Sequence, residues 1–353
     1  MTITAEHETT TAGAVWPLPG ITRAQAQQMF DALAAALGQG AGEGPADQPA
    51  DPPALMTAAP TPAPVSVSSG EAAVDVAAAE LVERVRPAAP VVAIMGPLRV
   101  VGAAGDAPVA RSTGTASEAQ TQRCAALAAF LALHPGASAE AYTAAFWPGE
   151  RADGPAAAAS RNKLSGQLRR YLGQDGEGRP FFPRLRADGY RLHEAVRTDW
   201  QVFCELVGSE PSRASTPALV AALRLVRGAP FEHARPRNIG WADDLHRVMV
   251  ERITAAAFEL GARAEVAGCV GHRQLAARVA RTVDPSCEAA WRASVAAEAA
   301  AGAREEVARL VEGLYAYLGA VEAEPEAETT ELVARLRAQG YRMGAGWEGL
   351  AGS

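Results

Sequence analysis

One segment, at about residues 156–172, combines helical periodicity with side chains suited to binding phosphates and bases. Leu164, Leu168 and Tyr171 recur at helical spacing and define its buried face. Rotating by about 100° per residue from that stripe places five residues outward: Asn162, Lys163, Gly166, Arg169 and Arg170, with Arg161 and Gln167 on the flanks. Arginine and lysine bind phosphates and guanine edges, asparagine binds adenine, and glycine allows a close backbone approach. An ordinary solvated charged face is the alternative interpretation.

A second basic element follows this helix. Asp188-Gly189 predicts a tight turn between two short strands, at residues 181–184 and 190–192. The hairpin would present three cations, namely Arg184, Arg186 and Arg191. Beside a helix in the major groove, such a hairpin is placed to meet phosphates or a neighbouring minor groove. The alternative is that these arginines pair with acidic residues nearby in sequence, namely Asp175, Glu177 and Asp188.

The distribution of charge supports the nucleic-acid interpretation more than the net charge of −7 does. Residues 1–90 hold 3 basic and 10 acidic side chains, whereas residues 91–192 hold 12 basic and 8 acidic ones. The middle of the chain is therefore its only basic block. The acidic residues 1–88 could mask that block in an autoinhibited state.

The elements around the basic helix follow the order of a winged helix. Residues 91–95 and 98–101 predict two strands about the turn at Gly96-Pro97. Helices are predicted at about 117–133, 138–146 and 156–172, each ended by glycine or proline, before the basic hairpin. We therefore expect a winged-helix DNA-binding domain of α+β class at residues 89–195.

The remainder of the chain predicts helices only. The predicted segments are residues 199–207, 217–226, 241–267, 272–283, 287–301, 304–318 and 327–338. Helices joined by short turns suggest stacked hairpins, as in tetratricopeptide (TPR) repeats. We expect a mainly α protein with an all-α, TPR-like domain at residues 196–340 and a tail at 341–353.

The N-terminal 88 residues predict a flexible, disordered extension with short helices. Residues 22–37 form an amphipathic pattern through Ala24, Met29, Phe30, Leu33 and Leu37. Residues 38–70 are rich in Pro, Ala, Gly and Ser, which is typical of a linker. A second short helix is predicted at residues 71–85.

Several function classes find no support in the sequence. The chain has one lysine, Lys163, without a preceding glycine-rich loop, and no HExxH, GxSxG or strand-linked GxGxxG motif. The four cysteines are far apart with no CxxC pair, so buried reduced thiols are favoured over zinc or disulfides. We expect no enzyme activity, cofactor or metal. The longest apolar run, residues 87–98, is too short to span a bilayer and no signal peptide is evident, which favours a cytoplasmic protein.

Short motifs in a fixed order carry a family resemblance over about residues 91–340. In the first half they are MGPLRV at 95–100, LALHPG at 131–136, FWPG at 146–149, SGQLRRYLG at 165–173 and GYRL at 189–192. In the second half they are TDW at 198–200, LVRGAPF at 225–231, WA at 241–242, DP at 284–285 with Glu288 and WR at 291–292, and EPE at 324–326. The order resembles the bacterial transcriptional activator domain regulators (BTAD, SARP-like) of actinobacteria, although this chain has an added N-terminal extension.

The resemblance implies a transcription regulator, and more narrowly an activator. It implies double-stranded DNA binding by the third helix and wing, through Arg161, Asn162, Lys163, Gly166, Arg169, Arg170, Arg184 and Arg186. The TPR-like domain would mediate homodimerisation or contact with RNA polymerase or another protein. The alternative is a protein–protein interaction adaptor whose winged helix no longer binds DNA.

Overall fold

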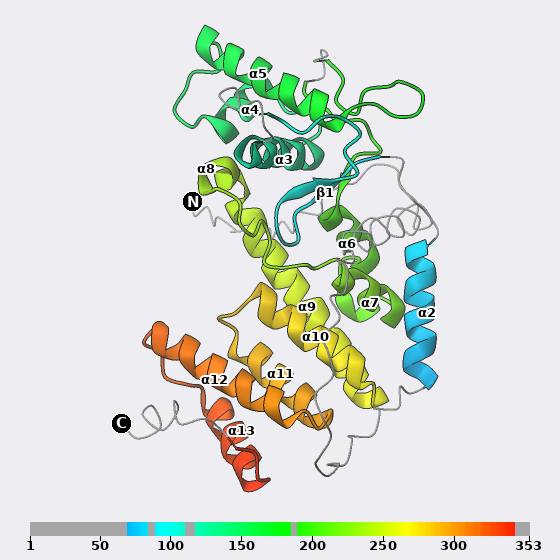
Figure 1. Ribbon diagram of the computed structural model, residues 1–353, viewed down its shortest axis with the longest axis vertical. Helices are drawn as coiled ribbons and strands as arrows, with labels where there is room; N and C mark the ends of the chain where they lie inside the picture. The colour runs from blue at the N-terminus through cyan, green and yellow to red at the C-terminus, as the bar shows by residue number, and fades with distance from the viewer. Residues whose placement is uncertain (1–68, 84–88, 110–116, 185–188, 343–353) are drawn as a thin grey trace, which may run out of the picture.

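The computed structural model describes residues 69–83, 89–109, 117–184 and 189–342. The described chain is mainly helical, with one small sheet (Figure 1). The elements up to the end of the predicted winged helix are α2 (Ser69–Glu83), β1 (Val91–Ala93), β2 (Arg99–Val101), α3 (Glu118–Leu133), α4 (Ala139–Phe146) and α5 (Pro155–Leu172). Those that follow are β3 (Arg197–Thr198), α6 (Asp199–Val207), α7 (Thr216–Arg224), α8 (Pro236–Ile239), α9 (Asp243–Ala267), α10 (Val270–Val283), α11 (Glu288–Ala300), α12 (Arg304–Ala320) and α13 (Ala327–Ala338).

The three-stranded sheet has the order β2-β1-β3. β1 and β2 pair antiparallel, with Val91 opposite Val101, as the predicted hairpin about Gly96-Pro97 requires. β3 pairs parallel to β1, with Val91 opposite Arg197. The sequence analysis predicted only helices beyond residue 195, so this strand was missed. A two-residue strand is too short to show alternation.

Polar N-caps start the first two helices of the predicted winged helix. Ser117 caps α3 by accepting a hydrogen bond from the backbone N–H of Gln120, and Ser138 caps α4 through the N–H of Ala141. The central stretch of α3, from Cys124 to Ala132, is buried on all sides. Its alanines let β1, β2 and α5 pack closely against one helix.

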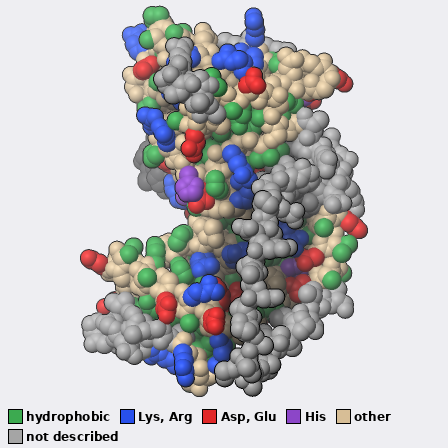
Figure 2. All heavy atoms as spheres, in the orientation of Figure 1, with side chains coloured by type: hydrophobic (Ala, Val, Ile, Leu, Met, Phe, Trp, Pro, Cys, Tyr) green, Lys and Arg blue, Asp and Glu red, His purple; other side chains and the backbone are tan. Residues whose placement is uncertain are grey.

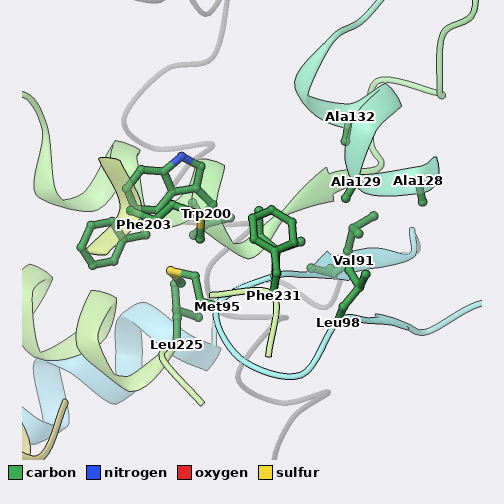
Figure 3. Close-up of a cluster of buried hydrophobic side chains, with 14 of the residues drawn as sticks. Val91, Met95, Leu98, Ala128, Ala129, Ala132, Trp200, Phe203, Leu225 and Phe231 are labelled. Atoms are coloured by element: carbon green, nitrogen blue, oxygen red, sulfur yellow. The ribbon is translucent and has the colours of Figure 1, made fainter. Parts of the chain in front are cut away.

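The two predicted domains share one hydrophobic core. Phe231, from the loop after α7, is buried in the same cluster as Val91 of β1, Leu98 just before β2 and Ala128 of α3 (Figure 3). The backbone joins them as well, because the N–H of Phe231 donates to the carbonyl of Ile94 at 2.8 Å. The segment after β1 is therefore fixed by the helical half of the chain.

The helical half consists of successive packed helices, with α10 against both α9 and α11. A separate apolar cluster joins α11, α12 and α13 through residues such as Val295, Leu310 and Val333. The predicted helical segments are all present, with bounds that differ by a few residues. The segment predicted at 241–267 begins in a short turn of 3-10 helix at Gly240–Ala242 before α9.

The predicted helix at 71–85 is α2, and it is not detached from the rest of the protein. It packs on α7, and Ala78 is fully buried in the main core. Glu71 accepts a hydrogen bond from the backbone N–H of His272 at the start of α10, at 2.9 Å. The prediction of a flexible extension is therefore wrong for α2. The predicted helix at 22–37 and most of the predicted linker lie outside the described residues.

The predicted strands of the basic hairpin do not form. Residues 181–184 contain no strand, and Tyr190 makes an isolated antiparallel bridge with Ala137 instead. Pro183 lacks an N–H donor for a regular ladder. The hairpin is nevertheless closed, because the N–H of His193 donates to the carbonyl of Phe181 at 2.8 Å.

Two features are absent from the described residues. No helix among them combines the length and apolar character needed to cross a membrane. No group of three or more histidine, cysteine, aspartate or glutamate side chains there could hold a metal ion. The cysteines are free, and burial raises the pKa of the Cys124 thiol to about 12.

Candidate nucleic-acid interface

α5 lies at one end of the elongated molecule, far from α13 at the other (Figure 1). Gly154 is its N-cap, Pro155 is its first residue, and Gly173 caps its C-terminus. Gly173 has a φ of 75°, and a Cβ there would lie 2.9 Å from backbone atoms of the β2–α3 connection. Leu164, Leu168, Tyr171 and Leu172 are buried on the inner face, as the apolar periodicity predicted. The helix is thereby fixed with its other face towards solvent.

The outer face of α5 presents most of the predicted set. Asn162, Lys163 and Arg170 are exposed, and a Cβ added at Gly166 would meet nothing within 4 Å. In the described part of the chain, neither Lys163 nor Arg170 forms an ion pair. The helix itself contains no acidic residue. Figure 2 shows Lys and Arg side chains at this end of the molecule.

Arg161 does not belong to that face. Only 7% of it is exposed, and its Nη1 donates to Thr143 Oγ1 at 2.6 Å and to the carbonyl of Ala152 at 2.9 Å. The side chain therefore holds α5 to α4 and to the loop between them. Arg161 was predicted to contact DNA, and its burial corrects that prediction. Its position on the flank of the apolar stripe is close enough to the core for the side chain to be buried with it.

Arg169 bridges α5 and the hairpin. Its Nε donates to the carbonyl of Phe182 at 2.8 Å and its Nη2 to that of Pro183 at 3.2 Å. The guanidinium also lies over the Phe182 ring, 5.1 Å from the centroid. Burial, and then the charge of Arg184, lower the pKa of Arg169. These contacts make Arg169 a positioning residue for the segment that carries Arg184.

The hairpin adds exposed cations beside α5. Arg184 is exposed, and its charge acts on Arg169, which places the two guanidinium groups near one another. Arg191 is also exposed. The predicted contact Arg186 and the acidic residue Asp188 lie outside the described residues.

The acidic residues before the hairpin have another partner. Asp175 accepts from Arg179 Nε at 2.7 Å, and Glu177 lies 3.1 Å from Arg179 Nη2. The alternative in which Asp175 and Glu177 neutralise the hairpin arginines therefore finds no support in this geometry.

One structural role was missed by sequence reasoning. Gln167, predicted on the flank of the outer face, donates from Nε2 to Gln120 Oε1 at 2.9 Å and so ties α5 to α3. Like the contacts of Arg169, this pairing joins residues distant in sequence. The hydrophobic pattern of α5 gives no signal of either.

Comparison with known proteins adds little. No family model and no curated protein matches the chain. Among solved structures, it is similar to Mycobacterium tuberculosis EmbR in complex with a low-affinity phosphopeptide, at 18% identity and a TM-score of 0.44. The match covers 74% of this chain and 68% of that one. A likeness this weak defines neither the family nor the function of the chain.

Proposed function

We propose that this protein is a DNA-binding transcription regulator that places α5 in the major groove and acts as an activator. The observation that carries the proposal is the outer face of α5, where Asn162, Lys163, Gly166 and Arg170 lie together, open to solvent and without an acidic residue. Gly166 lies four residues after Asn162, three after Lys163 and four before Arg170, so the four residues share one face of the helix.

The dimensions of this surface suit duplex DNA. A helix of 18 residues is about 27 Å long and, with side chains, about 10–12 Å wide, close to the width of the major groove. Asn162 and Arg170 are about two turns apart on the same face, with Gly166 between them. Asparagine and arginine can form hydrogen bonds with base edges. Glycine has no side chain, so the backbone at the centre of the helix can approach the bases closely.

Arg184 supplies a second contact in this proposal. Arg169 holds the backbone of Phe182 and Pro183 against α5, so the backbone immediately before Arg184 is fixed relative to that helix. A cation held beside the recognition helix would meet the phosphate row next to the groove. Arg186 belongs to the same proposal, as the next basic residue of the hairpin.

The test is duplex DNA binding by the full chain, measured by fluorescence anisotropy over a range of salt concentrations. We expect affinity to fall steeply with salt, and Lys163→Ala and Arg184→Ala each to reduce the salt slope by about one ion. Arg170→Ala should weaken binding and relax preference at one base position after selection from random sequences. Arg213→Ala is the control, because Arg213 is exposed on the helical half and pairs with Glu210.

If Lys163→Ala, Arg184→Ala and Arg170→Ala all bind DNA as tightly as the control Arg213→Ala, the assignment of this surface to DNA binding is contradicted. DNA binding that is absent at low salt would favour the adaptor function instead. One observation supports that second candidate: α9 exposes Phe258 and Val266 beside an apolar groove. In the adaptor function, RNA polymerase or another protein would bind the helical half, and capture of a stoichiometric partner without DNA would distinguish it.

A further inference from the structure

Among the described residues the longest helix is α9, and it carries a mainly apolar stripe that no described element covers. Val248, Phe258 and Val266 are 44%, 38% and 92% exposed. With the exposed Ala255 and Ala262 they fall within an arc of about 80° around the helix axis, which the exposed Glu251 interrupts between Val248 and Ala255. The stripe spans about 27 Å at the rise of an α-helix.

The stripe borders a groove built from three helices. α9, α10 and α11 enclose a cavity of about 300 Å³, lined mostly by alanines and by Phe258. Small side chains at the floor leave room for larger apolar side chains from outside. The charges at its lining, Glu265 and Arg273, pair with each other at 3.5 Å. This groove is therefore suited to an amphipathic helix with an apolar face, not to a charged ligand.

The chain enters beside this groove. Ser69 begins α2, and two residues later Glu71 accepts a hydrogen bond from the N–H of His272 in the first turn of α10. A Cβ at Gly271 would lie 2.5 Å from Glu71 Oε1, so a larger residue there would displace this carboxylate. The next residue after His272 is Arg273, which lines the groove. The start of α2 thus lies near one end of the groove.

We propose that residues 22–37 of the same chain bind in the groove between α9, α10 and α11 as an amphipathic helix. Met29, Phe30, Leu33 and Leu37 form its predicted apolar face. Its 16 residues would be about 24 Å long, which matches the stripe. Residues 38–68, predicted to be a linker, would span about 31 Å as a flexible coil, which is enough to reach any point of the groove.

Attachment makes this binding effective even for a weak contact. A flexible linker of this length presents the segment at an effective concentration of roughly millimolar. A free peptide at micromolar concentration therefore cannot displace it. In this arrangement the N-terminal segment and α2 together cover one side of the helical half, and release of the segment would expose a surface for a partner helix.

The test uses a labelled peptide of residues 22–37 and the full chain. The variant Phe30→Asp with Leu33→Asp, made in the chain and not in the peptide, should vacate the groove. We expect the peptide to bind this variant at least about tenfold more tightly than it binds the wild-type chain. A further Val266→Glu or Ala262→Glu change in the vacated chain should abolish binding. Val321→Glu, at an equally apolar position that is 52% exposed after α12, should not.

Three results would overturn the proposal. The first is equal binding of the peptide to the wild-type and Phe30→Asp, Leu33→Asp chains, or no binding to either. The second is binding that survives Val266→Glu and Ala262→Glu. The third is a wild-type dimer, in sedimentation, that Phe30→Asp with Leu33→Asp converts to monomer, because the segment would then occupy the groove of a second copy.

Discussion

The carboxylate of Asp199 and the guanidinium of Arg227 form a buried ion pair, with Oδ2 2.9 Å from Nη2, between the start of α6 and the loop after α7. The same carboxylate accepts hydrogen bonds from the backbone N–H groups of Ile94 and Met95, at 2.8 and 3.1 Å. Arg227 returns a backbone bond to the carbonyl of Met95. One charge pair thus fixes the turn between β1 and β2 to the helical half.

Removal of Arg227 should therefore destabilise the whole protein. Arg227→Ala leaves the fully buried carboxylate of Asp199 without its cation, and breaking such a pair typically costs about 3–5 kcal/mol. Urea denaturation of the full chain should show this loss of free energy of unfolding. Arg213→Ala removes an exposed pair and should change it by less than about 1 kcal/mol. A small effect for Arg227→Ala would mean that the two halves are not coupled through this pair.

Arg161 should matter for stability and not for DNA. Its Nη1 bonds to Thr143 and to the carbonyl of Ala152 are buried, so Arg161→Ala should lower the free energy of unfolding by roughly 1–3 kcal/mol. At a temperature where the variant is folded, its affinity for DNA should equal that of the wild type. Lys163→Ala, two residues away on the exposed face, should show the opposite pattern. A loss of DNA affinity in folded Arg161→Ala would contradict this and show that Arg161 contributes to DNA binding.

The sequence predicted elements better than it predicted their contacts. Local signals were sufficient for α3, α4 and α5, because serine caps, apolar periodicity and terminal glycines all lie within each segment. The outward positions of Asn162, Lys163 and Arg170 follow from the same periodicity. Arg161 and Arg169 differ, since their partners are a hydroxyl and carbonyls 9 to 18 residues away.

Long-range contacts account for the other differences. β3 forms because Arg197 and Thr198 meet β1, about a hundred residues earlier, and its local sequence carries no strand signal. α2 was predicted as a helix, but its attachment to α7 and α10 was not. In that attachment Glu71 pairs with the backbone of His272, and Asp75 pairs with the side chains of Arg224 and His272. Charge pairing between such distant residues has no periodic signature, so sequence reasoning assigned α2 to a flexible extension.

The attachment of α2 should depend on pH through Asp75. Its Oδ1 lies 2.6 Å from Arg224 Nη2 and 3.0 Å from His272 Nε2. Burial acts to raise the pKa of Asp75, but the hydrogen bond to His272 and the charge of Arg224 outweigh it, so the pKa is lowered. A lowered carboxyl pKa contributes stability above the unfolded value of about 3.9, and that stability is lost as the pH falls through the folded pKa.

Asp75→Asn keeps the shape of the side chain and removes the titrating group. We expect the wild type to resist urea better than Asp75→Asn at about pH 7, and the difference to shrink as the pH falls below about 4. Hydrogen exchange in residues 69–83 should report the same change locally. Asp244→Asn is the control, because Asp244 is almost fully exposed and pairs only with Arg247 among the described residues. A wild-type advantage that grows on acidification would contradict the assignment.

Substitution of Gly166 by alanine should change folding stability and DNA affinity in opposite directions. Gly166 lies inside α5, where glycine costs about 1 kcal/mol relative to alanine, and a Cβ there would meet nothing within 4 Å. Gly166→Ala should therefore raise the free energy of unfolding by up to about 1 kcal/mol. If α5 enters the major groove along the stripe of Asn162 and Arg170, the added methyl group should also weaken DNA binding. A variant that is more stable and binds less DNA can only be explained by contact at this face. Unchanged DNA affinity, with the expected gain in stability, would mean that the backbone at Gly166 does not approach the duplex.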